Sequence, residues 1–281
     1  MSGAFMHLLL VATALVGPVD IARAHFEAGE YSKAIVMLSD AHRTAPGDAA
    51  INYWLARSYY EKHDYELAIA YGEEAVKSSP QNAEYHRWLG RAYGAKAERS
   101  HSFFLARKVK KAFETAVKVG PLNIAARRDL MQYLVEAPGI IGGDKEKAKQ
   151  QAELIAKLDP IEGRLAWAAF FSAEKKWKEA EAEYLTALNQ NPNTIESYME
   201  AAEFFADRTD ADNLNRALAG AARLDAHDPR LTFYRAVVLI LRRVELPAAE
   251  ALLRSYVNNV PERSDYPSHK AALAWLRASR T

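Results

Sequence analysis

The stretches YSKAIVMLSDAHRTAP, residues 31–46, and YELAIAYGEEAVKSSP, residues 65–80, decide the fold of this chain. Both begin with Tyr, carry Ala at their fourth and eleventh positions and end in Pro, so one pattern recurs after 34 residues. A fixed period of this length is typical of stacked helical hairpins. The small residues suit a close crossing of two helices, and the proline suits the end of the second helix.

The pattern continues along most of the chain. It returns clearly from Trp177 to Pro192 and more weakly up to Pro261, which gives about seven units. These begin near residues 15, 49, 83, 124, 161, 195 and 229. Each unit needs a neighbour to bury its apolar face, so a final helix within residues 263–281 is expected to cap the stack. We therefore predict an all-α, right-handed superhelical solenoid of about seven hairpins over residues 15–262, with a C-terminal capping helix.

The period and the recurring Tyr, Ala and Pro positions resemble the tetratricopeptide repeat. The segments LGRAYGAKAE and ARRDLMQYLVEAPGIIGGDKEKA are similar to a group of exported bacterial tetratricopeptide proteins that carry a lengthened third unit and an APG-x-x-GG turn. This resemblance covers residues 20–160 and implies export and a scaffold role. It implies no catalytic residue.

The N-terminus carries an apolar run, Leu8–Val16, followed by no charged residue until Asp20. The run is too short to span a bilayer, and Ala12-Thr13-Ala14 offers a cleavage site, so residues 1–14 are predicted to be a signal peptide. No Lys or Arg precedes the run, which leaves a buried first helix as the alternative. A periplasmic or secreted location is expected, with the cytoplasm as the alternative.

Composition excludes several functions. The 281 residues carry a net charge of only +1, so no nucleic-acid partner is expected from the overall charge. The chain has no cysteine, so disulfides and thiolate chemistry are excluded. The eight histidines are dispersed, and neither H-E-x-x-H nor G-x-S-x-G occurs. We predict no enzyme activity, no cofactor and no metal site.

The third unit departs from the period, because it is seven residues longer than the second. The extended hairpin covers about residues 94–116, and its stretch AERSHSFFLARKVKKAF reads as continuous helix. Basic residues there alternate with Phe103 and Phe104, a pattern that could contact nucleic acid or an anionic membrane surface. The alternative, which we prefer from sequence alone, is a solvated basic face with both aromatics in the core.

A glycine-rich stretch at residues 138–143 precedes a charged helix. It lacks the Lys-Ser/Thr pair of a Walker loop and follows a helix instead of a strand. We predict a turn in which Pro138 ends one helix, the glycines permit positive φ and Asp144 caps the next helix. A loop that contacts a partner is the alternative.

Arginine recurs at the ninth position of the first three units, as Arg23, Arg57 and Arg91. This position lies on the stripe of the first helix that lines the concave groove of a solenoid. The predicted ligand-binding residues on this stripe are Arg23, Phe26, Tyr53, Arg57, Tyr60, Arg87 and Arg91.

A row of guanidiniums can bind carboxylates in pairs of hydrogen bonds. The predicted function is a non-enzymatic protein–protein interaction scaffold that holds an extended, acidic or carboxylate-bearing protein segment. In the alternative interpretation each Arg pairs with a nearby acid, namely Asp20, Glu27, Glu61 or Glu84. The ninth position becomes Gln132, Ala169, Glu203 and Val237 in later units. The competing function is a structural subunit for self-association or envelope-complex assembly, with peripheral membrane association left open.

Overall fold

The computed structural model describes residues 17–279, and within this range the chain forms α-helices and one short 3-10 helix, with no strand. Seven hairpins follow one another: α1 (Pro18–Glu27) with α2 (Tyr31–Thr44), α3 (Ala49–Glu61) with α4 (Tyr65–Ser78), α5 (Ala83–Ser100) with α6 (Phe103–Val119), α7 (Ile124–Glu136) with α8 (Lys145–Leu158), α9 (Pro160–Ala173) with α10 (Trp177–Asn189), α11 (Ile195–Asp207) with α12 (Ala211–Leu224), and α13 (Pro229–Leu241) with α14 (Leu246–Asn259). A last helix, α15 (His269–Ala278), caps the seventh hairpin, and η1 (Gly139–Ile141) lies between α7 and α8. The predicted all-α, right-handed superhelical solenoid is confirmed. The predicted signal peptide lies outside the described residues.

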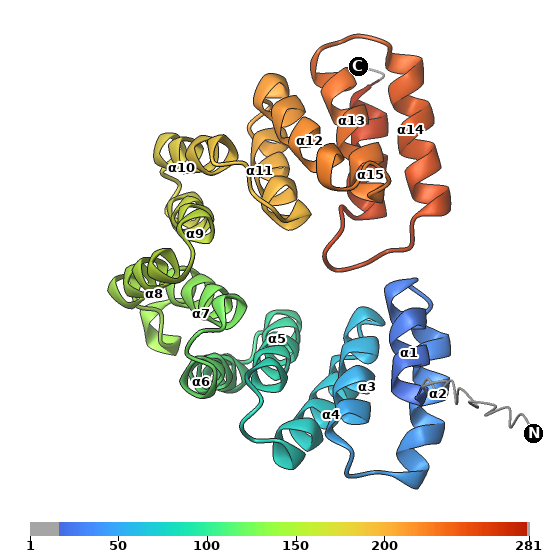
Figure 1. The fold of residues 1–281 in the computed structure, drawn as a ribbon, viewed down its shortest axis with the longest axis vertical. Coiled ribbons are helices and arrows are strands. Elements are labelled where there is room, and N and C mark those ends of the chain that lie inside the picture. The colour runs from blue at the N-terminus through green and yellow to red at the C-terminus, as the bar shows by residue number, and fades with distance from the viewer. Residues whose placement is uncertain (1–16, 280–281) are drawn as a thin grey trace, which may run out of the picture.

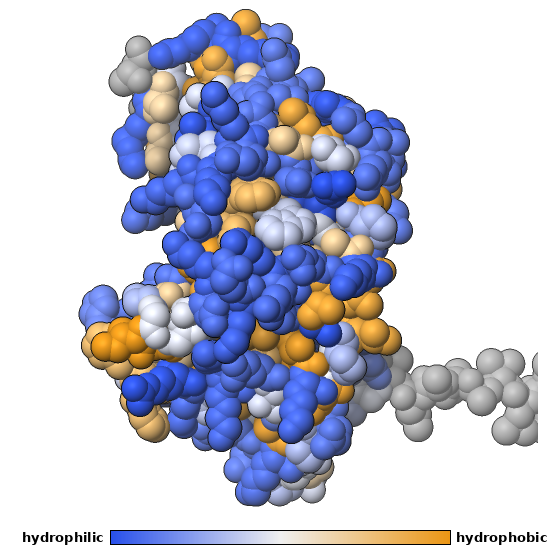
Figure 2. All heavy atoms as spheres, turned by 90° about the vertical axis from the view of Figure 1, so that its left-hand side faces the viewer, coloured by the Kyte–Doolittle hydropathy of each residue, from blue (hydrophilic) through white to orange (hydrophobic). Residues whose placement is uncertain are grey.

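The hairpins form an arc that comes back on itself (Figure 1). In this view α5, α7 and α9 lie on the inner side of the arc, and α6, α8 and α10 lie on the outer side. Ala34, Ala68 and Ala180 hold the same repeat position and are fully buried, as close helix crossings require. The outer face around α8 and α10 is mostly hydrophilic (Figure 2). Among the described residues no helix has the length and apolar character to cross a lipid bilayer.

Polar N-caps start most of the helices. Asp48, for example, accepts hydrogen bonds from the backbone N–H groups of Ala50 and Ile51 at 2.8 and 3.0 Å. Such caps satisfy N–H groups that have no partner within the helix. Asp159 serves twice, because it ends α8 and its side chain caps α9. The two helices are therefore joined by a single residue.

At least one residue at each hairpin turn adopts a left-handed backbone conformation, and the seventh turn has two, Arg243 and Glu245. In five units such a residue holds the fifteenth repeat position: Gly29 (φ 74°), His63 (φ 59°), Lys175 (φ 58°), Thr209 (φ 56°) and Arg243 (φ 57°). Only glycine adopts this conformation without a steric cost. The stacking of the hairpins therefore holds four of these side chains in an unfavourable backbone region.

The sequence had indicated a continuous helix through the lengthened third hairpin, and this prediction is wrong. His101 turns left-handed (φ 52°) and Ser102 caps α6, so the helix is interrupted between α5 and α6. The extra residues are shared by the two helices, which have 18 and 17 residues compared with 13 and 14 in the second hairpin. At 1.5 Å per residue the added residues lengthen α5 by about 7 Å and α6 by about 5 Å relative to the helices of the second hairpin.

The glycine-rich stretch forms the predicted turn. α7 ends at Glu136, Gly142 has a φ of 104°, and the Asp144 side chain accepts from Lys147 N at 3.1 Å to cap α8. The Tyr133 hydroxyl donates to the backbone oxygen of either Ala106 or Ile141, at 2.8 and 2.7 Å. The turn is thereby fixed against the extended third hairpin.

The two ends of the arc meet at a contact that we call the clasp, formed by residues 261–264 against Glu27, Gly29, Tyr31 and Glu61. The Glu61 carboxylate accepts from the backbone N–H and the hydroxyl of Ser264 at 2.9 and 2.7 Å. Arg263 donates to the backbone oxygen of Glu27 at 3.0 Å, and the Tyr31 hydroxyl donates to that of Glu262 at 3.3 Å. Figure 1 shows the connection between α14 and α15 beside the first hairpin. The clasp closes the solenoid into a ring.

Candidate ligand-binding face of the first three units

Arg57, on α3, lies among aromatic rings. Its guanidinium carbon is 4.3 Å from the centre of the Trp88 ring, 4.5 Å from that of Phe26 and 4.7 Å from that of Trp54. At these distances the ring faces attract the cation. Nη1 donates a long hydrogen bond of 3.5 Å to the Tyr53 hydroxyl, whereas the buried Nε has no acceptor in the described part of the chain. A buried N–H without an acceptor costs free energy, so a ligand oxygen would stabilise this side chain.

Arg91 lies one repeat further along, on α5, and uses the same tryptophan. Its guanidinium carbon is 4.7 Å from the centre of the Trp88 ring. Tyr60 packs edge-on against that ring, with centroids 5.7 Å apart. Burial raises the pKa of the Tyr60 hydroxyl, which therefore stays a neutral donor. Neither Arg57 nor Arg91 pairs with a carboxylate among residues 17–279. We call Arg57, Tyr60, Trp88 and Arg91 the Trp88 cluster.

Arg23, the first of the three recurring arginines, has a different environment. It is exposed, its Nη2 lies 3.6 Å from Asp20 Oδ1 and its Nε lies 3.9 Å from Glu27 Oε1. Both acids are on the same helix as Arg23. The alternative interpretation, in which each arginine pairs with a nearby acid, therefore describes this residue. Exposed pairs of this kind contribute little to stability.

Arg87 is occupied by acids. Its Nε donates to Asp129 Oδ2 and its Nη1 to Glu84 Oε1, both at 2.8 Å. Burial lowers the pKa of Arg87, but the carboxylates of Asp129 and Glu84 outweigh that effect and raise it. The pair with Asp129 joins the third unit to the fourth, so this arginine ties two neighbouring units together.

Phe26 and Tyr53, the other predicted residues, are buried beside Arg57. Phe26 contacts Trp54 edge-on with centroids 5.3 Å apart, and Tyr53 packs on Tyr85 at 4.8 Å. Burial raises the pKa of Tyr53 to about 12, so its hydroxyl is uncharged at neutral pH. Both rings support the guanidinium of Arg57 from within the fold.

The inner face changes character at the fourth unit. Arg128 pairs with Glu162 at 3.1 Å and with Glu200 at 2.5 Å, and so joins α7 to α9 and α11. Burial alone would lower the pKa of Arg128, but the carboxylates of Glu200 and Glu162 raise it. On α11, burial raises the pKa values of Glu203 and Asp207. From the fourth unit onward the ninth position holds no arginine, but Gln132, Ala169, Glu203 and Val237.

The central role of Trp88 was not predicted from sequence, where the tryptophans were assigned to packing. A signal was present, because Trp54 and Trp88 both hold the sixth position of their units, 34 residues apart. Each lies one helical turn from the ninth-position arginine of its own unit, at i and i+3. The described residues contain no group of three or more His, Asp or Glu that could hold a metal ion.

Comparison with known proteins identifies the repeat. Residues 19–83 and 56–95 match a family model of the tetratricopeptide repeat. No curated protein sequence matches the chain.

Several solved structures share the fold. A tetratricopeptide repeat protein from Parabacteroides merdae aligns with a TM-score of 0.58 at 12% identity, over 94% of this chain and 98% of that one. TTC0263, a thermophilic TPR protein of Thermus thermophilus, aligns with a TM-score of 0.53 at 20% identity, over 72% and 96%. Human IFIT1, in a dimer with PPP-AAAA, aligns with a TM-score of 0.53 at 17% identity, over 87% of this chain and 54% of that one. Residues 19–95 therefore carry tetratricopeptide repeats, and the chain shares the stacked-hairpin fold of solved tetratricopeptide repeat proteins.

Proposed function

We propose that the chain is a protein-interaction scaffold whose Trp88 cluster holds an extended, acidic or carboxylate-bearing segment of a partner protein. The tetratricopeptide fold is generally a non-enzymatic protein-interaction fold, which supports the scaffold role. The choice of partner chemistry depends on the side chains that this chain carries on its inner face.

The observation that carries the proposal is the state of Arg57 and Arg91. Both cations lie on Trp88, and neither is neutralised by a carboxylate within the described residues. Arg87 and Arg128, on the same inner face, are each paired with two acids. The buried Nε of Arg57 supplies a donor without an acceptor. A carboxylate bound between the two guanidiniums would satisfy that donor and be attracted by two charges at once.

We expect only some of the seven predicted residues to touch the ligand directly. Arg57, Arg91 and Tyr60 are the residues that we expect to touch the ligand. Phe26 and Tyr53 would act by holding Arg57 in position, and Arg87 by tying the third unit to the fourth. Arg23 is exposed and pairs on its own helix, so its contribution is expected to be small.

The test is a peptide-binding measurement with matched variants. Fluorescent peptides rich in Asp and Glu, with a free or an amidated C-terminus, are titrated into the protein and followed by anisotropy. Arg57→Gln with Arg91→Gln should raise the Kd at least about tenfold, because two charge-assisted hydrogen-bonding partners are lost. The control is Arg223→Gln with Arg235→Gln, which removes two exposed arginines from the sixth and seventh units.

Folding is measured in parallel by thermal unfolding. A large loss of stability in the Arg57/Arg91 variant, matched by the loss of binding, would mean that the two arginines serve the fold. Equal Kd values for the two double variants would contradict the proposal. A difference between free and amidated termini would identify a C-terminal carboxylate as the recognised group.

We also propose that the scaffold works outside the cytoplasm, after removal of residues 1–14. The apolar run from Leu8 to Val16 and its cleavage signal support this. Mass spectrometry of the protein recovered from its native host gives the mature N-terminus. A chain that still begins at Met1 would contradict export by cleavage.

A further inference from the structure

The tip of the third hairpin exposes two aromatic side chains. Phe103 and Phe104 start α6 and are 67% and 70% exposed, so the expectation that they lie in the core is wrong. They stand at the end that extends beyond the second hairpin. Two adjacent exposed phenylalanines are unusual on a soluble surface unless something covers them.

The glycine-rich turn enlarges this apolar surface. Ile140 is 78% exposed, and its neighbour Ile141 lines a hollow of about 270 Å³ together with Phe103. Ile140 and Ile141 also line a second hollow, of about 290 Å³, with Arg107 and Lys110. We call the surface formed by Phe103, Phe104, Ile140 and Ile141 the tip patch. Because Phe103 and Ile141 line the same hollow, the patch reaches from the third unit to the fourth.

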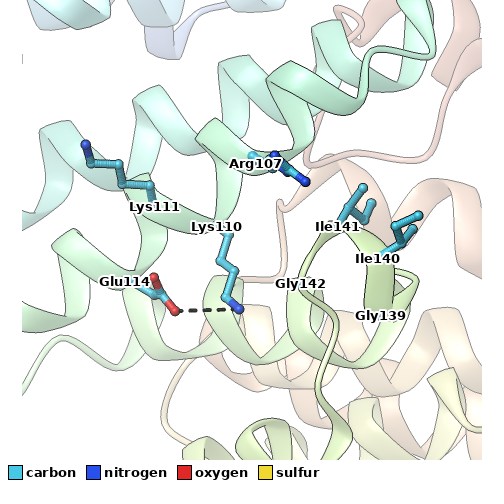
Figure 3. Close-up of a pocket in the computed structure, with 8 residues that line it drawn as sticks. All are labelled: Arg107, Lys110, Lys111, Glu114, Gly139, Ile140, Ile141 and Gly142. Atoms are coloured by element: carbon cyan, nitrogen blue, oxygen red, sulfur yellow. Dashed lines mark ion pairs between the residues drawn. The ribbon is translucent and has the colours of Figure 1, made fainter.

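Positive charge borders the tip patch. Residues 103–113 of α6 carry four cations and no acid, whereas the whole chain has a net charge of +1. Figure 3 shows Arg107 reaching toward Ile141 and Ile140, Lys110 paired with Glu114, and Lys111 pointing away from the turn. Arg107 and Lys111 are exposed and make no ion pair within the described residues. Lys108 lies over the Phe104 ring, 5.5 Å from its centre.

From this arrangement we infer that the tip patch docks on an anionic lipid surface, with Phe103, Phe104 and Ile140 in the interfacial layer and Arg107 and Lys111 against the headgroups. Aromatic rings and basic side chains side by side match the two layers of such a surface. Three acids lie near this region: Glu98, which lines the first hollow, Glu114, which is paired with Lys110, and Glu73, which is paired with Lys108 at 3.2 Å. They leave the charge of the region positive.

Surface and groove are separate parts of the molecule. The tip patch uses the hairpin end of the third unit and the turn after α7, whereas the Trp88 cluster lies on the inner helices α3 and α5. The inference therefore stands or fails independently of the proposed peptide binding. A scaffold docked by its tip patch would keep its inner face available to a protein partner.

Vesicle co-sedimentation tests the inference with the full chain. Vesicles of phosphatidylcholine alone are compared with vesicles that also contain phosphatidylglycerol. The wild type should bind the anionic vesicles more tightly, and added salt should weaken the binding. Phe103→Ser with Phe104→Ser should reduce the partition coefficient by at least about tenfold, and Arg107→Glu with Lys111→Glu by a similar factor.

Matched controls change the same chemistry elsewhere. Leu122→Ser with Val36→Ser removes two exposed apolar side chains, and Lys118→Glu with Lys178→Glu reverses two exposed charges. Both controls should bind vesicles as the wild type does. The four substituted positions, Phe103, Phe104, Arg107 and Lys111, are all exposed, so thermal unfolding should show intact folding.

Four outcomes would overturn the inference. In the first the wild type does not bind anionic vesicles, and in the second it binds both kinds of vesicle equally. In the third the patch and control variants lose the same amount of vesicle binding. In the fourth the protein binds a single-stranded RNA oligonucleotide but no vesicles. A concentration-dependent mass that only the Phe103/Phe104 variant loses, again without vesicle binding, would assign the tip patch to a second copy of the chain.

Discussion

The inner faces of the first three units and of the last three are built on the equivalent first helices of their hairpins but carry different side chains. The ninth repeat position is Arg23, Arg57 and Arg91 in the first group, and Ala169, Glu203 and Val237 in the second. Two of the arginines lie on one tryptophan and pair with no carboxylate among residues 17–279, whereas Glu203 is an acid whose pKa is raised by burial. The backbone repeats, so the difference comes from side chains alone. In a solenoid, binding chemistry changes from unit to unit while the packing positions stay constant.

Arg128, in the fourth unit, marks the boundary and offers the largest expected effect. It is held by Glu162 and Glu200, both on later units. Arg128→Met should lower the free energy of unfolding by about 3 kcal/mol, because it leaves two carboxylates partly buried without their cation. Chemical denaturation followed by circular dichroism measures this.

The comparison is with Arg57→Met, which removes a cation that has no acid partner. Its cost should be clearly smaller, about 1 kcal/mol from the lost ring contacts. If both substitutions cost the same, the distinction between a structural and a ligand-binding arginine on the inner face is not supported.

The clasp joins the first two hairpins to the segment that follows the seventh. Breaking it is expected to lower the free energy of unfolding by less than Arg128→Met does. Glu61→Ala removes the acceptor for two Ser264 donors, and this should lower the free energy of unfolding by about 1 kcal/mol. The larger consequence is geometric, because the ends of the arc would separate. Small-angle X-ray scattering should show a larger radius of gyration.

Glu27→Ala is the matched control for the clasp. Glu27 contributes only its backbone oxygen to Arg263, and its side chain lies 3.9 Å from Arg23, so the substitution should leave the scattering unchanged. Unchanged scattering in both variants would mean that the ring is held closed by the shape of the solenoid and not by the clasp.

The sequence was sufficient for the fold because the period of 34 repeats the packing positions. Ala34, Ala68 and Ala180 were read as crossing points and are fully buried. The turn at residues 138–143 was also predicted, since Pro138 and Asp144 act locally. In both cases the residues that determine the local structure lie within the same repeat unit or the same turn.

Contacts between distant residues were not predictable. The clasp joins residues more than 200 positions apart, and no pattern in either segment points to the other. The left-handed turn position is occupied by His63, Lys175 and Thr209, which share no chemistry. Phe103 and Phe104 follow a helical pattern but lie beyond the last neighbour that could cover them, so periodicity alone assigned them to the core.

The smallest expected effect concerns Glu203 in the second region. Burial raises its pKa above the ordinary value of 4.5, so the folded state binds a proton more readily than the unfolded state does. The stability of the wild type should therefore rise as the pH falls through the raised pKa toward 4.5. Glu203→Gln removes this partly desolvated charge and should stabilise the protein at neutral pH by less than about 1 kcal/mol, since the side chain is exposed to water.

The advantage of Glu203→Gln should disappear below the ordinary pKa of glutamate, where both proteins are uncharged at this position. Denaturation curves at several pH values measure the difference, and Glu179→Gln, an exposed residue on α10, controls for the loss of one negative charge. A stability difference that does not change with pH would mean that Glu203 is fully hydrated, and the inner face of the later units would then be as open to water as that of the first three. A pH-dependent difference would instead mean that the later units enclose their acid, which fits a face that packs against its own chain and leaves ligand binding to the first three units.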